Sequence, residues 1–318
     1  MKNKNIYFVT TIYSLALTIC LFFLYNFSKS NLINFNQLPV KFGATYMTMN
    51  NPFFNVINSQ INSTVEANGD ILITLDAQLS IENQIEQVEY LIDEGVKVIF
   101  INPVDYVKII PTLKKAKEAG IYIIAVDTNI VDDNNIVDAS IISDNILAGK
   151  LCAEDMMTNL EKARILILTH NTAVSAKERI EGFINTLTNE YEVVGYYECE
   201  GQIEKAMPIV LKAIEDGIKF DVVMALNDPS ALGALAAIQS KNIDNVLVYG
   251  VDGTPEAKKL VSDHLMQATV AQYPKVIGIK AISVAYDLLN GKSNYVDKLP
   301  VTLINKDNIE LFNIDGWQ

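Results

Sequence analysis

After Pro39 the chain alternates short apolar runs, rich in β-branched residues, with segments of amphipathic helical pattern. The apolar runs, which predict strands, are Val40–Tyr46, Ile71–Leu75, Val98–Ile101, Ile121–Val126, Ile165–Thr169, Tyr191–Tyr197, Val222–Ala225, Val246–Tyr249 and Gln267–Ala271. Helical patterns between them include Phe53–Asn68, Ile81–Glu94, Val107–Ala119, Asn145–Leu160 and Pro208–Asp216. Uninterrupted apolar runs are typical of parallel strands that helices cover on both faces. The repeated strand–helix units therefore predict an α/β fold of doubly wound parallel sheets.

The number of these units bears on the domain organisation. They are too many for one ordinary sheet, so we expect two Rossmann-like lobes, with a boundary near Ser143-Asp144. A dinucleotide-binding enzyme would need a G-x-G-x-x-G turn between a strand and a helix. Neither Gly250–Gly253 nor Gly233 fits that spacing, and the turn from Gly43 to Asn55 has no glycine cluster.

The N-terminal part of the chain follows a different pattern, a charge-free run from Ile6 to Phe27. At about 1.5 Å per residue, a helix of this length spans a hydrocarbon core of about 30 Å. Lys2 and Lys4 precede the run, which favours an N-terminus inside the cell. Residues 1–39 are thus predicted to be a transmembrane anchor and tether of a single-pass cell-membrane protein, with the rest of the chain outside. Cleavage as a signal peptide and lipidation of Cys20 are the alternatives.

Composition and charge exclude some classes of protein. The chain has 38 acidic and 25 basic residues, a net charge of -13, and no basic cluster, whereas nucleic-acid binding needs basic surface to neutralise phosphates. Cys20, Cys152 and Cys199 show no metal-ligand spacing, so neither a metal site nor another cofactor is predicted. Cys152 and Cys199 are interpreted as ordinary buried thiols, with a disulfide between them as the alternative.

Polar side chains with planar hydrogen-bonding groups follow most of the predicted strands. Ligands of open α/β sheets bind outside the carboxyl ends of the strands. Such groups can bond the vicinal hydroxyls of a sugar, and aromatic rings can cover its apolar faces. Each residue also has a purely structural explanation, such as an N-cap for an Asn or Asp, or a surface pair with Glu178 or Glu181 for the arginine. The candidates are Phe53, Phe54, Asn102, Asp127, Arg179, Asn227, Asp252 and Gln272.

Six motifs in order make the chain resemble the periplasmic sugar-binding proteins of the ribose-binding type, over about residues 40–310. They are Asn51-Pro52-Phe53-Phe54, Asn102-Pro103-x-Asp105, Arg179-x-Glu181-Gly182-Phe183, Asn227-Asp228 with Leu232-Gly233-Ala234, Gly250–Pro255 and Ala268–Gln272. The resemblance implies two lobes joined by three crossovers, with the ligand in the hinge cleft. The implied lobes are residues 40–143 plus 274–304 and residues 144–273 plus 305–318. It also implies that Phe53 and Phe54 stack on the sugar, while the other six candidates bond its hydroxyls.

Two departures from the family pattern bear on the ligand. The ribose-binding pattern has an arginine directly after the aspartate that matches Asp127, and this chain has Thr128. A third stacking aromatic is expected near Gln202–Lys205, where none occurs. The sugar therefore stays open among small aldoses, including pentoses such as xylose.

Several functions are compatible with a receptor of this kind. We expect an anchored receptor that closes on a small monosaccharide and signals to a membrane sensor histidine kinase. The alternative is the substrate-binding protein of an ABC sugar importer, whose partner is the permease. A repressor would need a DNA-binding motif where the apolar segment stands. Catalysis would rest on His170, which follows a strand but lacks a nucleophile motif around it, so we expect no enzyme.

Overall fold

The computed structural model describes residues 14–26, 38–130, 136–292 and 295–318. The chain divides into two compact units, Met1–Val40 and Lys41–Gln318. In the first unit, residues 14–26 form a helix, and the predicted anchor Ile6–Phe27 extends beyond it into residues outside the described ranges. Among the described residues, no helix combines the length and apolarity that a membrane span requires. The transmembrane helix expected from the sequence is therefore not found there.

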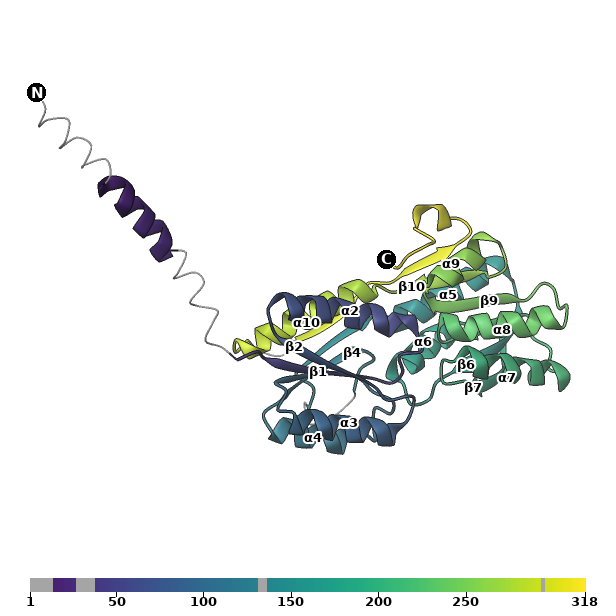
Figure 1. Cartoon of the computed structure of the whole chain (residues 1–318). Coiled ribbons are helices and arrows are strands. Elements are labelled where there is room, and N and C mark those ends of the chain that lie inside the picture. Colours follow the sequence, from purple (N-terminus) through teal and green to yellow (C-terminus); the bar gives the residue numbers. More distant parts are fainter. Residues whose placement is uncertain (1–13, 27–37, 131–135, 293–294) are drawn as a thin grey trace, which may run out of the picture. The chain divides into compact units, whose positions relative to one another are not determined.

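The second unit begins with a lobe built on a six-stranded parallel sheet in the order β11-β5-β4-β3-β1-β2 (Figure 1). Its strands are β1 (Lys41–Tyr46), β2 (Ile71–Asp76), β3 (Val98–Asn102), β4 (Tyr122–Asp127), β5 (Ala139–Ser143) and β11 (Tyr295–Leu299). Its helices are α2 (Pro52–Ala67), α3 (Ile81–Asp93), α4 (Ile110–Glu118) and α10 (Pro274–Leu289). Helix α10 packs against α2 on one face of the sheet, and α3 packs against α4 on the other.

The second lobe has a six-stranded sheet in the order β12-β10-β9-β8-β6-β7, in which only β12 runs antiparallel. Its strands are β6 (Ala163–Thr169), β7 (Tyr191–Glu198), β8 (Val222–Ala225), β9 (Leu247–Asp252), β10 (Ala268–Ala271) and β12 (Thr302–Asn305). Its helices are α5 (Asn145–Asn159), α6 (Val174–Ile184), α7 (Ile203–Glu215), α8 (Asp228–Ser240), α9 (Pro255–Ser262) and the 3-10 turn η1 (Ile309–Leu311). The two doubly wound lobes agree with the expected fold class.

The chain passes between the lobes after β5, after β10 and after β11. The last passage differs from the boundary implied by the resemblance, which gave residues 274–304 to the first lobe. Strand β12 begins at Thr302 and pairs with β10, with Val270 opposite Leu303. The second lobe therefore takes up the chain again at Thr302, because β12 completes the edge of its sheet.

Local signals explain most helix boundaries. Gly95, Gly120 and Gly217 follow α3, α4 and α7 with φ of +69°, +77° and +78°, the left-handed conformation that glycine adopts at little cost. Helix α7 begins at Ile203, earlier than the expected start at Pro208, which lies inside it. As the sixth residue of the helix, Pro208 removes one backbone hydrogen bond and crowds the preceding turn, and the buried side chains of Val210 and Ala213 hold the helix in place beyond it.

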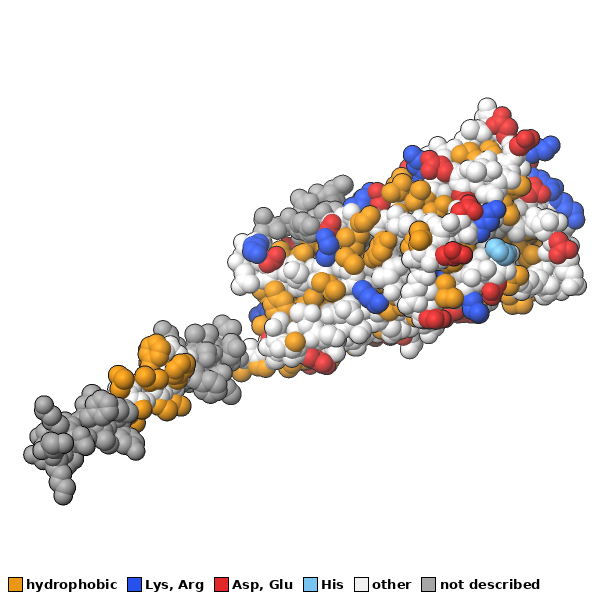
Figure 2. All heavy atoms as spheres, turned by 90° about the horizontal axis from the view of Figure 1, so that it is seen from above, with side chains coloured by type: hydrophobic (Ala, Val, Ile, Leu, Met, Phe, Trp, Pro, Cys, Tyr) orange, Lys and Arg blue, Asp and Glu red, His pale blue; other side chains and the backbone are white. Residues whose placement is uncertain are grey.

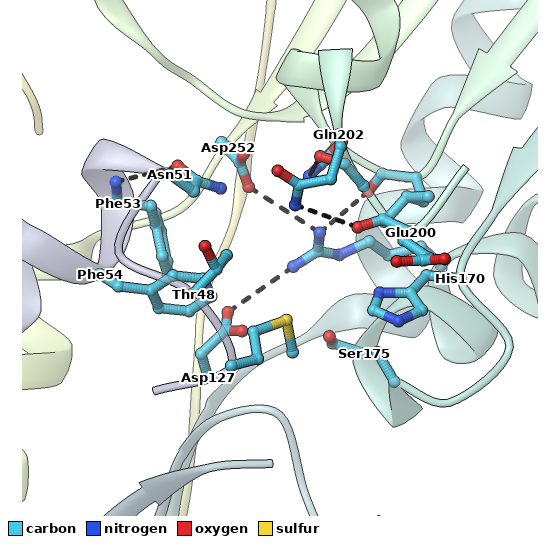
Figure 3. A pocket seen from close by; sticks show the side chains of 16 residues that line it. Thr48, Asn51, Phe53, Phe54, Asp127, His170, Ser175, Glu200, Gln202 and Asp252 are labelled. Atoms are coloured by element: carbon cyan, nitrogen blue, oxygen red, sulfur yellow. Dashed lines mark hydrogen bonds and ion pairs between the residues drawn. The ribbon is translucent and has the colours of Figure 1, made fainter. Parts of the chain in front are cut away.

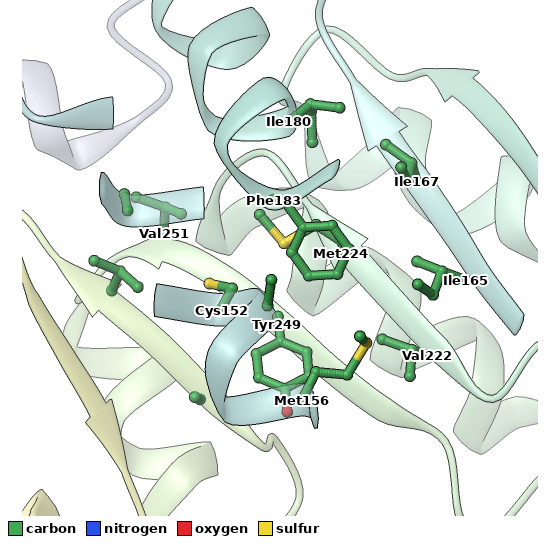
Figure 4. Close-up of a cluster of buried hydrophobic side chains, with 14 of the residues drawn as sticks. Cys152, Met156, Ile165, Ile167, Ile180, Phe183, Val222, Met224, Tyr249 and Val251 are labelled. Carbon is green, nitrogen blue, oxygen red and sulfur yellow. The ribbon is translucent and has the colours of Figure 1, made fainter. Parts of the chain in front are cut away.

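The core of the second lobe lies between its sheet and helices α5 and α6 (Figure 4). Met156, Phe183 and Tyr249 fill it, and the Tyr249 hydroxyl donates to Asp155 Oδ2 at 2.8 Å, so that the buried ring keeps its polar end bonded. Cys152 is buried in the same cluster and is a free thiol, as is Cys199. The alternative of a Cys152–Cys199 disulfide was therefore wrong.

Acidic and basic side chains are mixed on the surface of the chain that Figure 2 shows. Many form pairs one helical turn apart, such as Lys212 with Asp216 at 2.9 Å and Lys259 with Asp263 at 3.9 Å. Exposed pairs of this kind contribute little to stability. Three buried charged side chains, Asp127, Arg179 and Asp252, lie instead at the cavity between the two lobes.

Candidate ligand-binding site

A small cavity of about 40 Å³ lies between the lobes, at the carboxyl ends of strands from both sheets (Figure 3). Six of the eight residues predicted from the sequence line it. They are Phe53, Phe54, Asp127, Arg179, Asn227 and Asp252. The first three come from the first lobe and the last three from the second. The cavity is thus a shared site that exists only while the lobes are together.

Arg179, on α6, lines this site with 3% of its surface exposed. Its Nε donates to Asn145 Oδ1 and its Nη1 to the Leu226 carbonyl, both at 2.9 Å. Its guanidinium also faces the carboxylates of Asp127 and Asp252, each at 3.8 Å. That distance is too long for a hydrogen bond. The guanidinium therefore neutralises two carboxylates without using up their hydrogen-bonding capacity, and the surface pairing considered for it does not occur.

Three acceptor oxygens in and beside the cavity are buried and have no hydrogen-bond partner in the described part of the chain. They are Asp127 Oδ1, Asp252 Oδ2 and Gln272 Oε1. Buried polar atoms are nearly always bonded, and an unsatisfied one costs about 1–3 kcal/mol. Two of the three, Asp127 Oδ1 and Asp252 Oδ2, belong to residues that line the cavity, so they call for a ligand that brings hydrogen-bond donors.

Asp127 and Asp252 are held by unusual backbone at the ends of β4 and β9. Their φ values are +65° and +146°, a region that non-glycine residues seldom occupy. Burial raises the pKa of Asp127 to about 6, opposed by the Arg179 charge and the Asn102 hydrogen bond. Burial and then the Asp228 charge raise the pKa of Asp252 well above its usual range. Both carboxyl groups are poised to gain from donors supplied by a ligand.

Because the pKa of Asp127 is raised in the folded protein, the free energy of unfolding should fall as the pH rises. The folded pKa of about 6 exceeds the ordinary value of 3.8 for an aspartate, so the folded chain binds more protons between these values. Stability is then lost as pH rises from about 4 to about 6, by about 3 kcal/mol in total. We expect the free energy of unfolding of Asp127→Asn, measured in urea, to rise relative to that of the wild type as the pH increases over this range. A difference that stays constant with pH would contradict the assignment.

The aromatic wall of the cavity is Phe53 with Phe54, in the first turn of α2. Asn51 caps this helix, and its Oδ1 accepts from the Phe53 backbone N–H at 3.0 Å. The two rings meet edge to face with centroids 5.6 Å apart, and Phe54 also packs on Tyr46 at 5.9 Å. Both phenylalanines are almost fully buried, so they serve the core and the cavity at once.

The other predicted residues hold the site together. Asn102 does not line the cavity: its Nδ2 donates to Asp127 Oδ2 at 3.2 Å and to the Val126 carbonyl. Gln272 likewise lies behind Asp252, to which its Nε2 donates at 2.8 Å. Asn227 lines the cavity and also caps α8, where its Oδ1 accepts from the Ser230 N–H at 3.0 Å.

The sequence did not single out several residues that line the cavity, among them Thr48, Asn51, Ser175 and Gln202. Asn51 belongs to a motif that was recognised, but its place before Pro52 identifies only a helix cap. Gln202 occupies the stretch where the resemblance implied an aromatic ring. Thr48, Asn51 and Gln202 lie in loops and Ser175 in the first turn of α6, and their approach to one another depends on how the two lobes meet.

His170 also lines the cavity, as its position after β6 suggested it could. Its ring nitrogen Nε2 lies 3.0 Å from Thr172 Oγ1, and burial lowers its pKa. A neutral imidazole at this edge can donate or accept a hydrogen bond. We find no nucleophile beside it among the residues that line the cavity.

Direct hydrogen bonds join the lobes beside the cavity. Thr128 Oγ1 donates to Ser175 Oγ at 2.6 Å and accepts from the Ser175 backbone N–H at 2.9 Å. Lys177 Nζ donates to the Tyr106 hydroxyl at 3.0 Å. We call the pair Thr128 and Ser175 the latch. Thr128 stands at the position where the family pattern has an arginine. The lobes are in contact in the closed arrangement.

Comparison with known proteins agrees with this architecture. A family model described as a periplasmic binding protein domain matches residues 42–293. The ribose import binding protein of Bacillus subtilis is 32% identical over 259 residues, which cover 81% of this chain and 84% of that protein. The galactofuranose-binding protein of Escherichia coli is 29% identical over 68% of this chain and 72% of its own length.

A solved structure shows the same fold. The ABC transporter solute binding protein of Bacillus halodurans, crystallised with bound myo-inositol, superposes with a TM-score of 0.80. The match has 26% sequence identity and covers 86% of this chain and 96% of that one. The two-lobe fold is therefore shared with that protein.

Proposed function

The chain belongs to the family of periplasmic binding protein domains, and from that membership we propose that it is the sugar-binding protein of an ABC importer. Proteins of this family bind solutes and are not enzymes. The observation that carries the proposal is the pair of unsatisfied buried acceptors, Asp127 Oδ1 and Asp252 Oδ2, on two residues from different lobes that line one cavity. The sequence had favoured a sensor that signals to a histidine kinase. Relatives named as import binding proteins favour the importer instead.

A monosaccharide supplies the chemistry that the cavity lacks. Its hydroxyls would donate to Asp127 Oδ1 and Asp252 Oδ2, and a ring or hydroxyl oxygen would accept from the free side of the Arg179 guanidinium. Its apolar C–H face would lie against Phe53 and Phe54. Because these groups belong to both lobes, a bound sugar stabilises the closed state over the open one.

Titration calorimetry with the purified protein tests this proposal directly. The relatives suggest the panel: ribose, D-allose, galactofuranose and arabinofuranose, to which we add xylose, with myo-inositol as a cyclic polyol. We expect at least one member to bind with a one-to-one stoichiometry and to raise the melting temperature. If none of them binds, the proposed function is wrong.

The partner is a separate part of the proposal. An importer's binding protein delivers its sugar to a permease, so genes for a permease and its ATPase are expected beside this one. The direct measurement is ATP hydrolysis by that permease in membrane vesicles, which the loaded protein should stimulate. If a histidine kinase is encoded beside this gene instead, and its autophosphorylation responds to the loaded protein, the sensor hypothesis would be supported.

We further propose that the N-terminal apolar run keeps the binding unit at the outer face of the cell membrane. The support is the charge-free sequence from Ile6 to Phe27 and the preceding Lys2 and Lys4. Mass spectrometry of the membrane fraction should find the intact N-terminus. A mature chain that starts at Cys20 or beyond Phe27 would refute the anchor.

A further inference from the structure

The last six residues of the chain, 313–318, are held against the second lobe by one buried lysine. Lys258 on α9 is 1% exposed. Its Nζ donates to the carbonyls of Asn313 and Gly316 and, at 3.1 Å, to Gln318 Oε1. A lysine buried in this way needs such acceptors around its ammonium group. Residues 313–318 are called the strap below.

The strap reaches the turn that carries a ligand-binding carboxylate. Gln318 Nε2 donates to the carbonyl of Gly253, next to Asp252, at 3.1 Å. Gly253 has a φ of +70°, and a Cβ on it would lie 2.3 Å from Gln318 Nε2. The positive φ favours glycine here, and a side chain at this position would have to displace the end of Gln318 from the turn.

On its other side the strap contacts the first lobe. The Trp317 ring meets the Phe53 ring edge-on, with centroids 5.7 Å apart and an interplanar angle of 66°. Lys275, in the first turn of α10, donates to the Trp317 carbonyl at 2.9 Å. Helix α10 packs against α2, the helix that carries Phe53. Figure 1 shows the C-terminus where α10 and α2 of one lobe approach α9 of the other.

From these contacts we propose that the strap couples the two lobes and that Trp317 is a positioning residue for the aromatic wall of the sugar site. Trp317 is not among the residues that line the cavity, but it packs on Phe53, which is. Because Lys258 fixes the strap to the second lobe, movement of that lobe changes the Trp317–Phe53 contact. The inference rests on the proposed function in so far as the wall binds a sugar.

The coupling can be measured because Trp317 is the single tryptophan of the chain. In the sugar-free protein, Phe53→Leu should shift its emission to longer wavelength and increase its quenching by acrylamide, since a ring that covers the indole is lost. Unchanged emission and quenching would show that Trp317 does not pack on Phe53 and would overturn the proposed coupling. This arm needs no ligand, so it decides the strap even if no sugar binds and the proposed function fails.

The second arm uses the sugar identified by calorimetry. An aromatic pair of this geometry corresponds to a change of about threefold to tenfold in affinity. We expect Trp317→Ala to weaken binding by that factor and Trp317→Phe to restore most of it. Leu311→Ala, at a side chain 84% exposed just before the strap, is the matched control and should bind as the wild type does. Wild-type affinity in Trp317→Ala would overturn the positioning role while leaving the proposed function intact.

Discussion

Replacing Arg179 with methionine is expected to weaken sugar binding by about 2–5 kcal/mol, which is about thirtyfold to several thousandfold. Within the ranges that the structure describes, the guanidinium is the one positive group that pairs with both Asp127 and Asp252, each at 3.8 Å. Without it, two buried carboxylates face each other across the cavity with no compensating charge, and such groups then take up protons or repel. A sugar would lose a donor and meet carboxyl groups that no longer act as anionic acceptors.

The chain's other arginine provides the control for this prediction. Arg164 pairs with Asp221 at 2.8 Å on the surface, where both side chains are about two-fifths exposed. Arg164→Met should therefore change the affinity by less than twofold. Arg179→Lys keeps the charge but loses the planar fork, so it should lie between the two. Calorimetry on all three variants, with circular dichroism to verify folding, checks the order; equal affinities for Arg179→Met and the wild type would remove Arg179 from the site.

Replacing Asp252 with alanine is expected to weaken binding by about 2–3 kcal/mol, or about 30-fold to 150-fold. Its Oδ2 has no partner in the described chain, while its Oδ1 accepts from Gln272 at 2.8 Å. The variant removes the acceptor that a sugar hydroxyl would use and leaves the Gln272 amide without its partner. Both effects act against the bound state.

Asp263→Ala is the matched control, because Asp263 makes only a long surface pair with Lys259 at 3.9 Å and lies at the far end of α9. It should bind sugar as the wild type does. Unchanged calorimetric affinity of Asp252→Ala for the true ligand would show that the hydroxyls are bonded elsewhere.

The sequence predicted the architecture well because burial on both faces leaves a strong signal in β1, β3, β4 and β8. It did not single out β5, a buried five-residue strand inside the first sheet, nor β11 and β12, which are short edge strands with alternating or mixed patterns. Their pairing depends on residues far away in the chain. Whether such a segment forms an edge strand depends on its tertiary contacts more than on its local sequence pattern.

The candidate site was predicted in position but not in detail. A polar residue at a strand end is placed by topology, which brought six candidates to one cavity. Whether its side chain faces the ligand or a neighbour depends on torsion angles that the sequence does not reveal. Asn102 and Gln272 therefore direct their amide groups to Asp127 and Asp252. Ser175 and Trp317 act across the lobes and had no local signal.

The latch between Thr128 and Ser175 has a consequence for the empty protein. One hydrogen bond worth about 1 kcal/mol raises the ratio of closed to open molecules about fivefold, without any sugar. A larger resting fraction of closed molecules tightens the apparent affinity, because less of the binding energy is used to shift the population. It also makes the unloaded and loaded forms resemble each other. In an importer, empty molecules would then dock on the permease in the closed shape, and sugar-independent ATP hydrolysis that falls in Ser175→Ala would be the sign of it.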